Sequence, residues 1–188
     1  MAIDLSAAQR AEAARVAEAL QRALEVARAP RAVRWASSSQ MHVTLRFIGE
    51  VGDAEGTRLV GSLTPPLSVP PFSLALGAPG VFPGPGRPRV LWIGLADGIA
   101  GAAASHDAIE HRLNAAGVPP EARSFRAHLT LGRAREIRPV QASALREAMN
   151  RLSIDPAPAT VTHATLYRSH LSPKGARYEA LVRTMLAG

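Results

Sequence analysis

Apolar and polar residues alternate strictly along residues 41–47. The odd positions of this segment are all apolar, and the even positions hold His42, Thr44 and Arg46. Because successive side chains of a β-strand point to opposite faces, the pattern predicts a strand over residues 41–48 with one buried face. His42, Thr44 and Arg46 are expected on its other face.

The same alternation recurs in residues 127–131, where His128 and Thr130 lie between apolar residues. Both segments therefore read His-x-Thr-Leu, and a third copy occurs at residues 163–166. With six His and eight Thr in 188 residues, one chance His-x-Thr is not unusual. Two copies on strictly alternating strands are much less expected by chance. We therefore predict that these two strands bring two imidazoles and two hydroxyls around one small anion.

Apolar residues spaced three and four positions apart predict the helices. The first helix runs from Ser6, which forms a capping box with Gln9, to about residue 28, and its apolar stripe includes Val16, Leu20 and Leu24. Further helices are predicted over residues 54–63, 99–116 and 139–152. Further strands are predicted over residues 72–76, 90–95, 160–170 and 177–185, with turns at 49–53 and 172–175 and an exposed Gly- and Pro-rich loop at 77–88.

This order of elements lacks the regular spacing of parallel β-α-β units, and several strands are joined by hairpin-like turns. It predicts an α+β fold on a mainly antiparallel sheet. A helix followed by a His-x-Thr strand occurs twice, which indicates two related lobes around a central cleft. We expect residues 1–188 to form this single bilobal domain.

Composition and charge narrow the function classes. Apolar residues make up 47% of the chain, and no apolar run approaches the roughly 20 residues that a membrane span needs. There is no recognisable export signal and no cysteine, so we expect a cytoplasmic bacterial or archaeal protein without disulfides or thiolate metal sites.

The excess of positive charge indicates a phosphate-bearing partner. Lys and Arg number 22 against 15 Asp and Glu, and Lys174 is the one lysine. Arginine presents a planar fork that suits phosphate oxygens. Eight aromatic rings and no basic run argue against an extended nucleic-acid stacking surface, so a compact phosphate site is expected.

Two histidines can supply both proton transfers of phosphodiester hydrolysis, because imidazole titrates near neutral pH. The threonines and an arginine can donate hydrogen bonds to the non-bridging oxygens. A strained 2′,3′-cyclic phosphate is a natural substrate for such a site. No metal-ligand motif is present, so neither a metal nor another cofactor is expected.

The other histidines are expected to have no catalytic role. His163 has only Thr, Ala and Leu around it, which favours a structural residue. His106 and His111 are predicted on one helix with Glu110 and are expected to be solvated. His170 lies at a strand end and is assigned no role.

The tandem His-x-Thr pattern resembles the 2H phosphoesterases, and most closely the bacterial RNA 2′,3′-cyclic phosphodiesterases, also called 2′-5′ RNA ligases. The likeness extends over nearly the whole chain. It is carried by the opening residues 2–5, by residues 33–35 and 42–51 around the first motif, by residues 89–94, by residues 125–133 around the second motif, and by a closing hairpin from residue 166 to Tyr178.

The resemblance implies a bilobal fold with catalysis by His42 and His128, and with Thr44 and Thr130 as phosphate ligands. It implies that Arg133, which follows the second motif, contacts the substrate. It further implies that His128 acts as the base on the attacking water and His42 as the acid on the leaving 3′ oxygen, so that the phosphate remains on the 2′ position.

The leading interpretation is an enzyme that opens 2′,3′-cyclic phosphates at RNA ends or on nucleotides. Two alternatives keep the same site, namely 2′-5′ RNA joining and hydrolysis of a small cyclic nucleotide. A non-catalytic RNA-binding module is a third, although a binder has no need of two titrating groups. No membrane association and no obligatory protein partner are expected, which favours a monomer.

Overall fold

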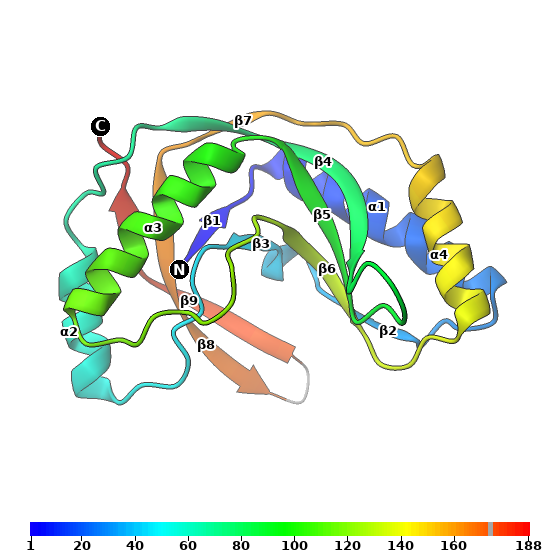
Figure 1. Cartoon of the computed structure of the whole chain (residues 1–188), viewed down its shortest axis with the longest axis horizontal. Helices are drawn as coiled ribbons and strands as arrows, with labels where there is room; N and C mark the ends of the chain where they lie inside the picture. The colour runs from blue at the N-terminus through cyan, green and yellow to red at the C-terminus, as the bar shows by residue number, and fades with distance from the viewer. Residues whose placement is uncertain (173–174) are drawn as a thin grey trace.

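A computed structural model describes residues 1–172 and 175–188 and shows four α-helices around an antiparallel sheet (Figure 1). The helices are α1 (Ala7–Val26), α2 (Asp53–Leu63), α3 (Ile99–Ala115) and α4 (Pro139–Arg151), and a short 3₁₀ turn, η1, covers Ser38–Gln40. The strands are β1 (Ala2–Asp4), β2 (Val33–Trp35), β3 (His42–Thr44), β4 (Phe72–Phe82), β5 (Val90–Asp97), β6 (Leu129–Ala134), β7 (Ala159–Val161), β8 (His163–Ser172) and β9 (Gly175–Met185). The predicted α+β class with an antiparallel sheet is confirmed.

The strand order shows an approximate two-fold relation between the halves of the chain. The sheet runs β7-β4-β5-β6-β3-β1-β8-β9, with β2 paired beside β6. Exchanging β1 with β5, β3 with β6 and β4 with β8 gives the central part of this order read from the other end. The two His-x-Thr segments thus become neighbours at the middle of the sheet, where β3 pairs with β6.

The helices divide between the two halves of the sheet. Helix α1 begins at the predicted Ser6 cap, packs against α4 and reaches β6, while α4 also contacts β4. Helices α2 and α3 pack together, and α2 also contacts β9. The predicted apolar stripe of α1 is confirmed, since Val16, Leu20 and Leu24 are fully buried. Each half therefore has its own pair of helices, as the prediction of two lobes requires.

The strand predicted over residues 41–48 is shorter than expected. The backbone N–H groups of Leu45 and Arg46 both donate to the carbonyl of Met1, at 2.9 and 3.1 Å. Two residues therefore lie opposite one, which is the arrangement of a β-bulge and breaks the alternation of faces. As a result Leu45 and Arg46 are both buried, and the prediction that Arg46 shares the face of His42 and Thr44 is wrong.

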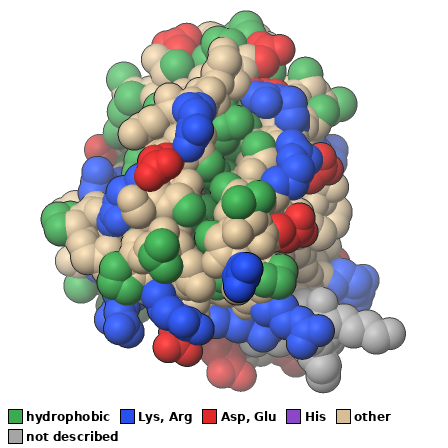
Figure 2. Space-filling model, turned by 90° about the vertical axis from the view of Figure 1, so that its right-hand side faces the viewer, with side chains coloured by type: hydrophobic (Ala, Val, Ile, Leu, Met, Phe, Trp, Pro, Cys, Tyr) green, Lys and Arg blue, Asp and Glu red, His purple; other side chains and the backbone are tan. Residues whose placement is uncertain are grey.

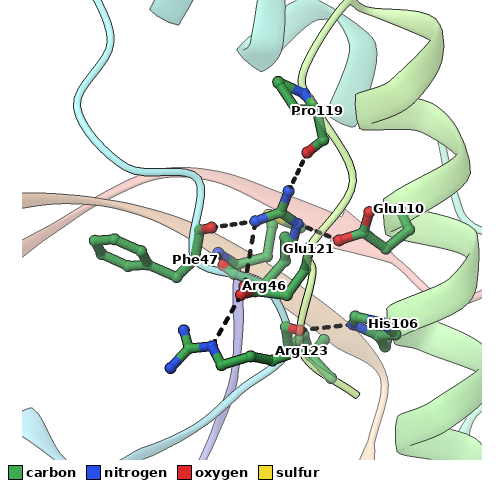
Figure 3. A network of polar contacts seen from close by, with 9 residues as sticks. Arg46, Phe47, His106, Glu110, Pro119, Glu121 and Arg123 are labelled. Atoms are coloured by element: carbon green, nitrogen blue, oxygen red, sulfur yellow. Dashed lines mark hydrogen bonds and ion pairs between the residues drawn. The ribbon is translucent and has the colours of Figure 1, made fainter. Parts of the chain in front are cut away.

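Arg46 instead forms the centre of a buried polar network (Figure 3). Its guanidinium is paired with the carboxylates of Glu110 and Glu121 and donates to the carbonyl oxygens of Phe47 and Pro119. These partners satisfy a charge that would be costly to bury alone. The network connects β3 to α3 and to the segment that leads to the second motif.

The prediction that His106 is solvated is also wrong. His106 stacks on the Phe125 ring with 4.4 Å between the ring centroids, and its Nδ1 lies 2.8 Å from the carbonyl oxygen of Leu45. Glu110 is drawn inward by Arg46. His111, on the next turn, is exposed as predicted. The sequence pattern of α3 alone could not show that a buried arginine from another strand would face it.

The segment over residues 77–88, predicted to be a loop, is partly strand. Strand β4 continues through Pro79 and Gly80 to Phe82, with a register shift at residues 76–79. A Cβ atom at Gly80 would lie 2.4 Å from the Trp92 ring, so glycine here makes room for the indole. Glycine and proline in this strand mark a bulge and a close packing contact.

The strand predicted over residues 160–170 is divided at Thr162. Strand β7, before it, pairs with β4, and β8, after it, pairs with β1 and β9. The chain thus crosses from one half of the sheet to the other at this residue. The predicted turn at 172–175 joins β8 to β9, and its central residues 173 and 174 lie outside the described residues. Among the described residues, no helix combines the length and apolar character needed to span a membrane.

The Arg46 network yields a prediction on stability. Replacing Arg46 by Met should lower the free energy of unfolding by about 3–5 kcal/mol, because Glu110 is left with an uncompensated buried charge. Urea unfolding measures this change. The double variant Arg46→Met/Glu110→Gln should regain part of the loss, and Arg58→Met, on an exposed position of α2, is the matched control. A single Arg46 variant within about 0.5 kcal/mol of wild type would contradict the network's role.

Candidate active site

The pairing of β3 with β6 brings the two motifs together. Val43 lies directly opposite Leu129, and both side chains are fully buried in the core. Continued by one residue on each side, this antiparallel register sets His42 opposite Thr130 and Thr44 opposite His128. Side chains directly opposite each other project from the same face with Cβ atoms about 5 Å apart. The four motif side chains therefore form one group on the face turned away from the core.

Within this group the two histidines occupy diagonal positions. Each histidine has the other motif's threonine as its cross-strand neighbour, which follows from the antiparallel register of β3 and β6. His42, His128 and Thr130 are half-buried, and Thr44 is exposed. An anion bound at the centre of the group would have an imidazole on each of two sides and a hydroxyl on each of the other two.

A backbone carbonyl group holds the imidazole ring of His128. Nδ1 of His128 lies 2.6 Å from the carbonyl oxygen of Arg126, two residues earlier. At His42 the backbone of Gln40, also two residues earlier, raises the pKa of the ring. Since a carbonyl only accepts, Nδ1 of His128 must carry a proton and Nε2 is the nitrogen that can exchange one.

Burial lowers the pKa of His42 and of His128 below the ordinary value of 6.5. Positive charges lower both pKa values further. At His42 the N-terminal ammonium group and Arg10 lower the pKa and the Asp4 carboxylate raises it, whereas at His128 the guanidinium groups of Arg126 and Arg133 lower it. Of the two rings, His42 is the one that has a carboxylate among these charges.

Aromatic rings flank each histidine. The rings of Tyr178 and Tyr167 lie 5.2 and 6.3 Å from that of His42, measured between centroids. On the other side the Phe82 ring lies 5.1 Å from His128 and stacks on Trp92 at 4.9 Å. Sequence reasoning did not assign these residues to the site. Phe82 fell in the predicted loop at 77–88, and the faces of the other three could not be compared with those of the motifs without the sheet register.

Asp4 is a second residue that sequence reasoning missed. It is paired directly with His42 in the β1–β3 register, and so lies on the same face. Its carboxylate accepts hydrogen bonds from Thr165, at 2.8 Å, and from the Tyr167 hydroxyl. Burial, followed by the Asp4 contact, raises the pKa of Tyr167 to about 12, so this phenol stays protonated and donates.

His163, the histidine of the third His-x-Thr, is separated from the motif histidines. Its Nε2 lies 3.7 Å from the Asp4 carboxylate, so Asp4 stands between it and His42. This position agrees with the prediction that His163 has no catalytic role. His170 pairs with Glu179 at 2.7 Å on the outer hairpin.

Arg133 reaches the motif face through a bulge in β6. In simple alternation, Arg133 and Thr130 would lie on opposite faces, being three residues apart. Between Leu91 and Trp92 the register of β5 against β6 shifts, so that Trp92 pairs with Thr130 and Leu91 with Gly132. Leu131 is thus the extra residue and is fully buried, while Arg133 is exposed on the side of His128.

A comparison with family models identifies the family. The model described as "2′-5′ RNA ligase superfamily" matches residues 6–173 of the chain. The chain belongs to this superfamily. Its resemblance to the 2H phosphoesterases, first indicated by the motifs, is confirmed.

Curated relatives and solved structures agree with this assignment. An RNA 2′,3′-cyclic phosphodiesterase of Aeropyrum pernix is 32% identical over 148 residues, which cover 78% of this chain and 82% of the relative. A Thermus thermophilus crystal structure superposes with a TM-score of 0.74 at 25% identity, covering 98% and 95% of the two chains. Escherichia coli LigT complexed with 3′-AMP gives a TM-score of 0.66 at 26% identity, covering 100% of this chain and 96% of LigT.

The lowered pKa values of this superfamily member's motif histidines predict its pH dependence. The pH profile of kcat/KM should be bell-shaped, because one imidazole must be neutral and the other protonated. Since burial lowers the pKa of both, both limbs should lie at lower pH than for free imidazole, with a maximum below about pH 6.5. Initial rates on a cyclic-phosphate substrate between about pH 4.5 and 8.5 measure it, with circular dichroism as a control for folding. A rate that rises steadily through pH 8 would exclude two lowered histidines as the acid and base.

Proposed function

We propose that this enzyme hydrolyses 2′,3′-cyclic phosphates at RNA ends and leaves a 2′-phosphate. His42 and His128 are the catalytic residues of this proposal. The observation that carries it is the pairing of Val43 with Leu129 between β3 and β6, whose register, continued by one residue each way, supports a diagonal arrangement of two imidazoles and two threonines around one position. The names of the curated relatives support the choice of substrate.

The chemistry follows from that arrangement. The cyclic phosphate lies between the histidines, and the hydroxyls of Thr44 and Thr130 donate hydrogen bonds to its non-bridging oxygens. One imidazole takes a proton from a water molecule as the water oxygen attacks phosphorus. The other gives a proton to the ribose oxygen as its bond to phosphorus breaks. One water is consumed, and the enzyme returns to its starting state once a proton passes between the two imidazoles through solvent.

The Asp4 carboxylate beside His42 supports an assignment of roles. Asp4 favours the protonated form of His42, against the N-terminal ammonium group and Arg10, and this suits the acid that protonates the leaving 3′ oxygen. Arg126 and Arg133 disfavour the protonated form of His128, which suits the base that activates water. Loss of the 3′ oxygen from phosphorus leaves the phosphate on the 2′ position.

Several further properties belong to the proposal. Two imidazoles provide both proton transfers, so the reaction requires no metal or other cofactor. The enzyme acts as a cytoplasmic monomer without an obligatory protein partner. Arg133 contacts the substrate through its exposed guanidinium. Joining of RNA ends by a 2′-5′ bond uses the same phosphorus and the same histidines, and is the alternative activity that the family description favours.

The two motif histidines should be essential for activity. His42→Ala and His128→Ala should each lower the rate by at least about 100-fold, the usual scale for losing a general acid or base. His163→Ala should remain near wild type, because Asp4 lies between it and the motif pair. Single-turnover rates on an RNA oligonucleotide with a terminal cyclic phosphate measure the effect. Loss of activity in folded His163→Ala would move the site away from the motif pair.

The product and a sulfur-substituted substrate test the reaction and the roles. In the presence of excess EDTA, the wild-type enzyme should convert a cyclic-phosphate oligonucleotide into one with a 2′-phosphate. A substrate with sulfur at the 3′ position has a better leaving group and should selectively restore His42→Ala. A 3′-phosphate product, or rescue of His128→Ala instead, would reverse the assigned geometry. Joined ends without hydrolysis would favour the ligase alternative.

A further inference from the structure

Two arginines lie directly opposite each other beside the proposed active site. Arg34 of β2 is paired with Arg133 of β6, and both side chains are exposed. Like charges at directly opposite positions of a sheet repel each other and destabilise the pair. Val90, the neighbour of Arg133 on β5, offers no compensating charge.

Within residues 1–172 and 175–188, no carboxylate oxygen lies within 4.0 Å of either guanidinium. Arg46 shows the contrast, since its charge is balanced by two glutamates. Arg34 and Arg133 thus place two guanidinium groups, neither of them paired with a carboxylate, at neighbouring positions. A phosphate group is the ligand that such a pair of forks suits best.

The pair faces the same way as the motif side chains. Val33, the residue before Arg34, is buried against the core, so Arg34 projects from the opposite face. The bulge at Leu131 turns Arg133 to that face as well. Arg133 is close enough to His128 to lower the pKa of this histidine. Arg34 lies on the neighbouring strand β2, which pairs with β6.

The distance suits the neighbouring phosphate of an RNA chain. At a strand rise of about 3.3 Å per residue, Arg133 lies no more than about 10 Å along β6 from Thr130. The arginine side chains are long and flexible, so their guanidinium groups can extend toward the motif side chains across part of this distance. The side of the molecule on which β2 and the end of β6 lie shows more basic than acidic side chains (Figure 2).

We propose that Arg34 and Arg133 together bind the phosphodiester that precedes the terminal cyclic phosphate in an RNA strand. This inference rests on the proposed function and adds to it a binding site for a second phosphate of the substrate. The enzyme should use oligonucleotides better than the corresponding cyclic mononucleotide, which lacks that phosphodiester. Arg34 is the specificity-determining residue of the pair, because it is the one further from the motif histidines.

The test compares two substrates with the same 3′ base, a short RNA with a terminal 2′,3′-cyclic phosphate and the cyclic mononucleotide. In Arg34→Gln the kcat/KM ratio of oligonucleotide to mononucleotide should fall about 10-fold, because one charge-assisted contact to the outer phosphate is lost. Arg34→Lys should recover part of the ratio. The salt dependence of the oligonucleotide KM should become shallower by about 0.7 in log–log slope.

Arg58→Gln is the matched control, an exposed arginine on α2 in the other half of the molecule, and should keep the wild-type ratio. Equal losses on both substrates, or an unchanged ratio in Arg34→Gln, would overturn the inference. Binding of a labelled oligonucleotide that already carries a 2′-phosphate, followed by fluorescence anisotropy, gives a readout independent of turnover. A wild-type enzyme that cleaves neither substrate refutes the proposed function, and the binding difference then decides the inference alone.

Discussion

The pairing of β3 with β6 is the interaction on which the proposed site depends. Val43 and Leu129 lie opposite each other in the core, and this register sets His42 beside Thr130 and Thr44 beside His128. A shift of either strand by one residue would turn the histidine and threonine of that strand into the core. The buried pair therefore fixes the geometry of the exposed group, and the approximate two-fold relation of the sheet makes its two halves equivalent.

Bulges end the regular alternation on each motif strand and thereby shape the surroundings of the group. After Thr44 the chain turns Arg46 inward, where Glu110 and Glu121 balance its charge. After Thr130 the extra residue Leu131 turns Arg133 outward toward the site. The same device thus gives one arginine a structural position and leaves the other available to a ligand.

The sequence was sufficient to predict the two motifs, the four helices and the antiparallel class, because these depend on short-range periodicity. It could not predict the burial of Arg46, since a bulge set by the Met1 carbonyl breaks the alternation from which its face was inferred. Asp4 was missed because its place beside His42 depends on a β1–β3 register that short-range patterns do not contain. The strand through Gly80 was missed because its glycine serves packing against Trp92.

The central claim is that one phosphate position lies between the two diagonal histidines. A crystal structure of the enzyme with a nucleoside 2′-phosphate tests this claim most directly. The account predicts the phosphate within hydrogen-bond distance of Nε2 of both His42 and His128, with the hydroxyls of Thr44 and Thr130 on its remaining oxygens. A phosphate bound away from either histidine, with the imidazoles in unchanged positions, would contradict it.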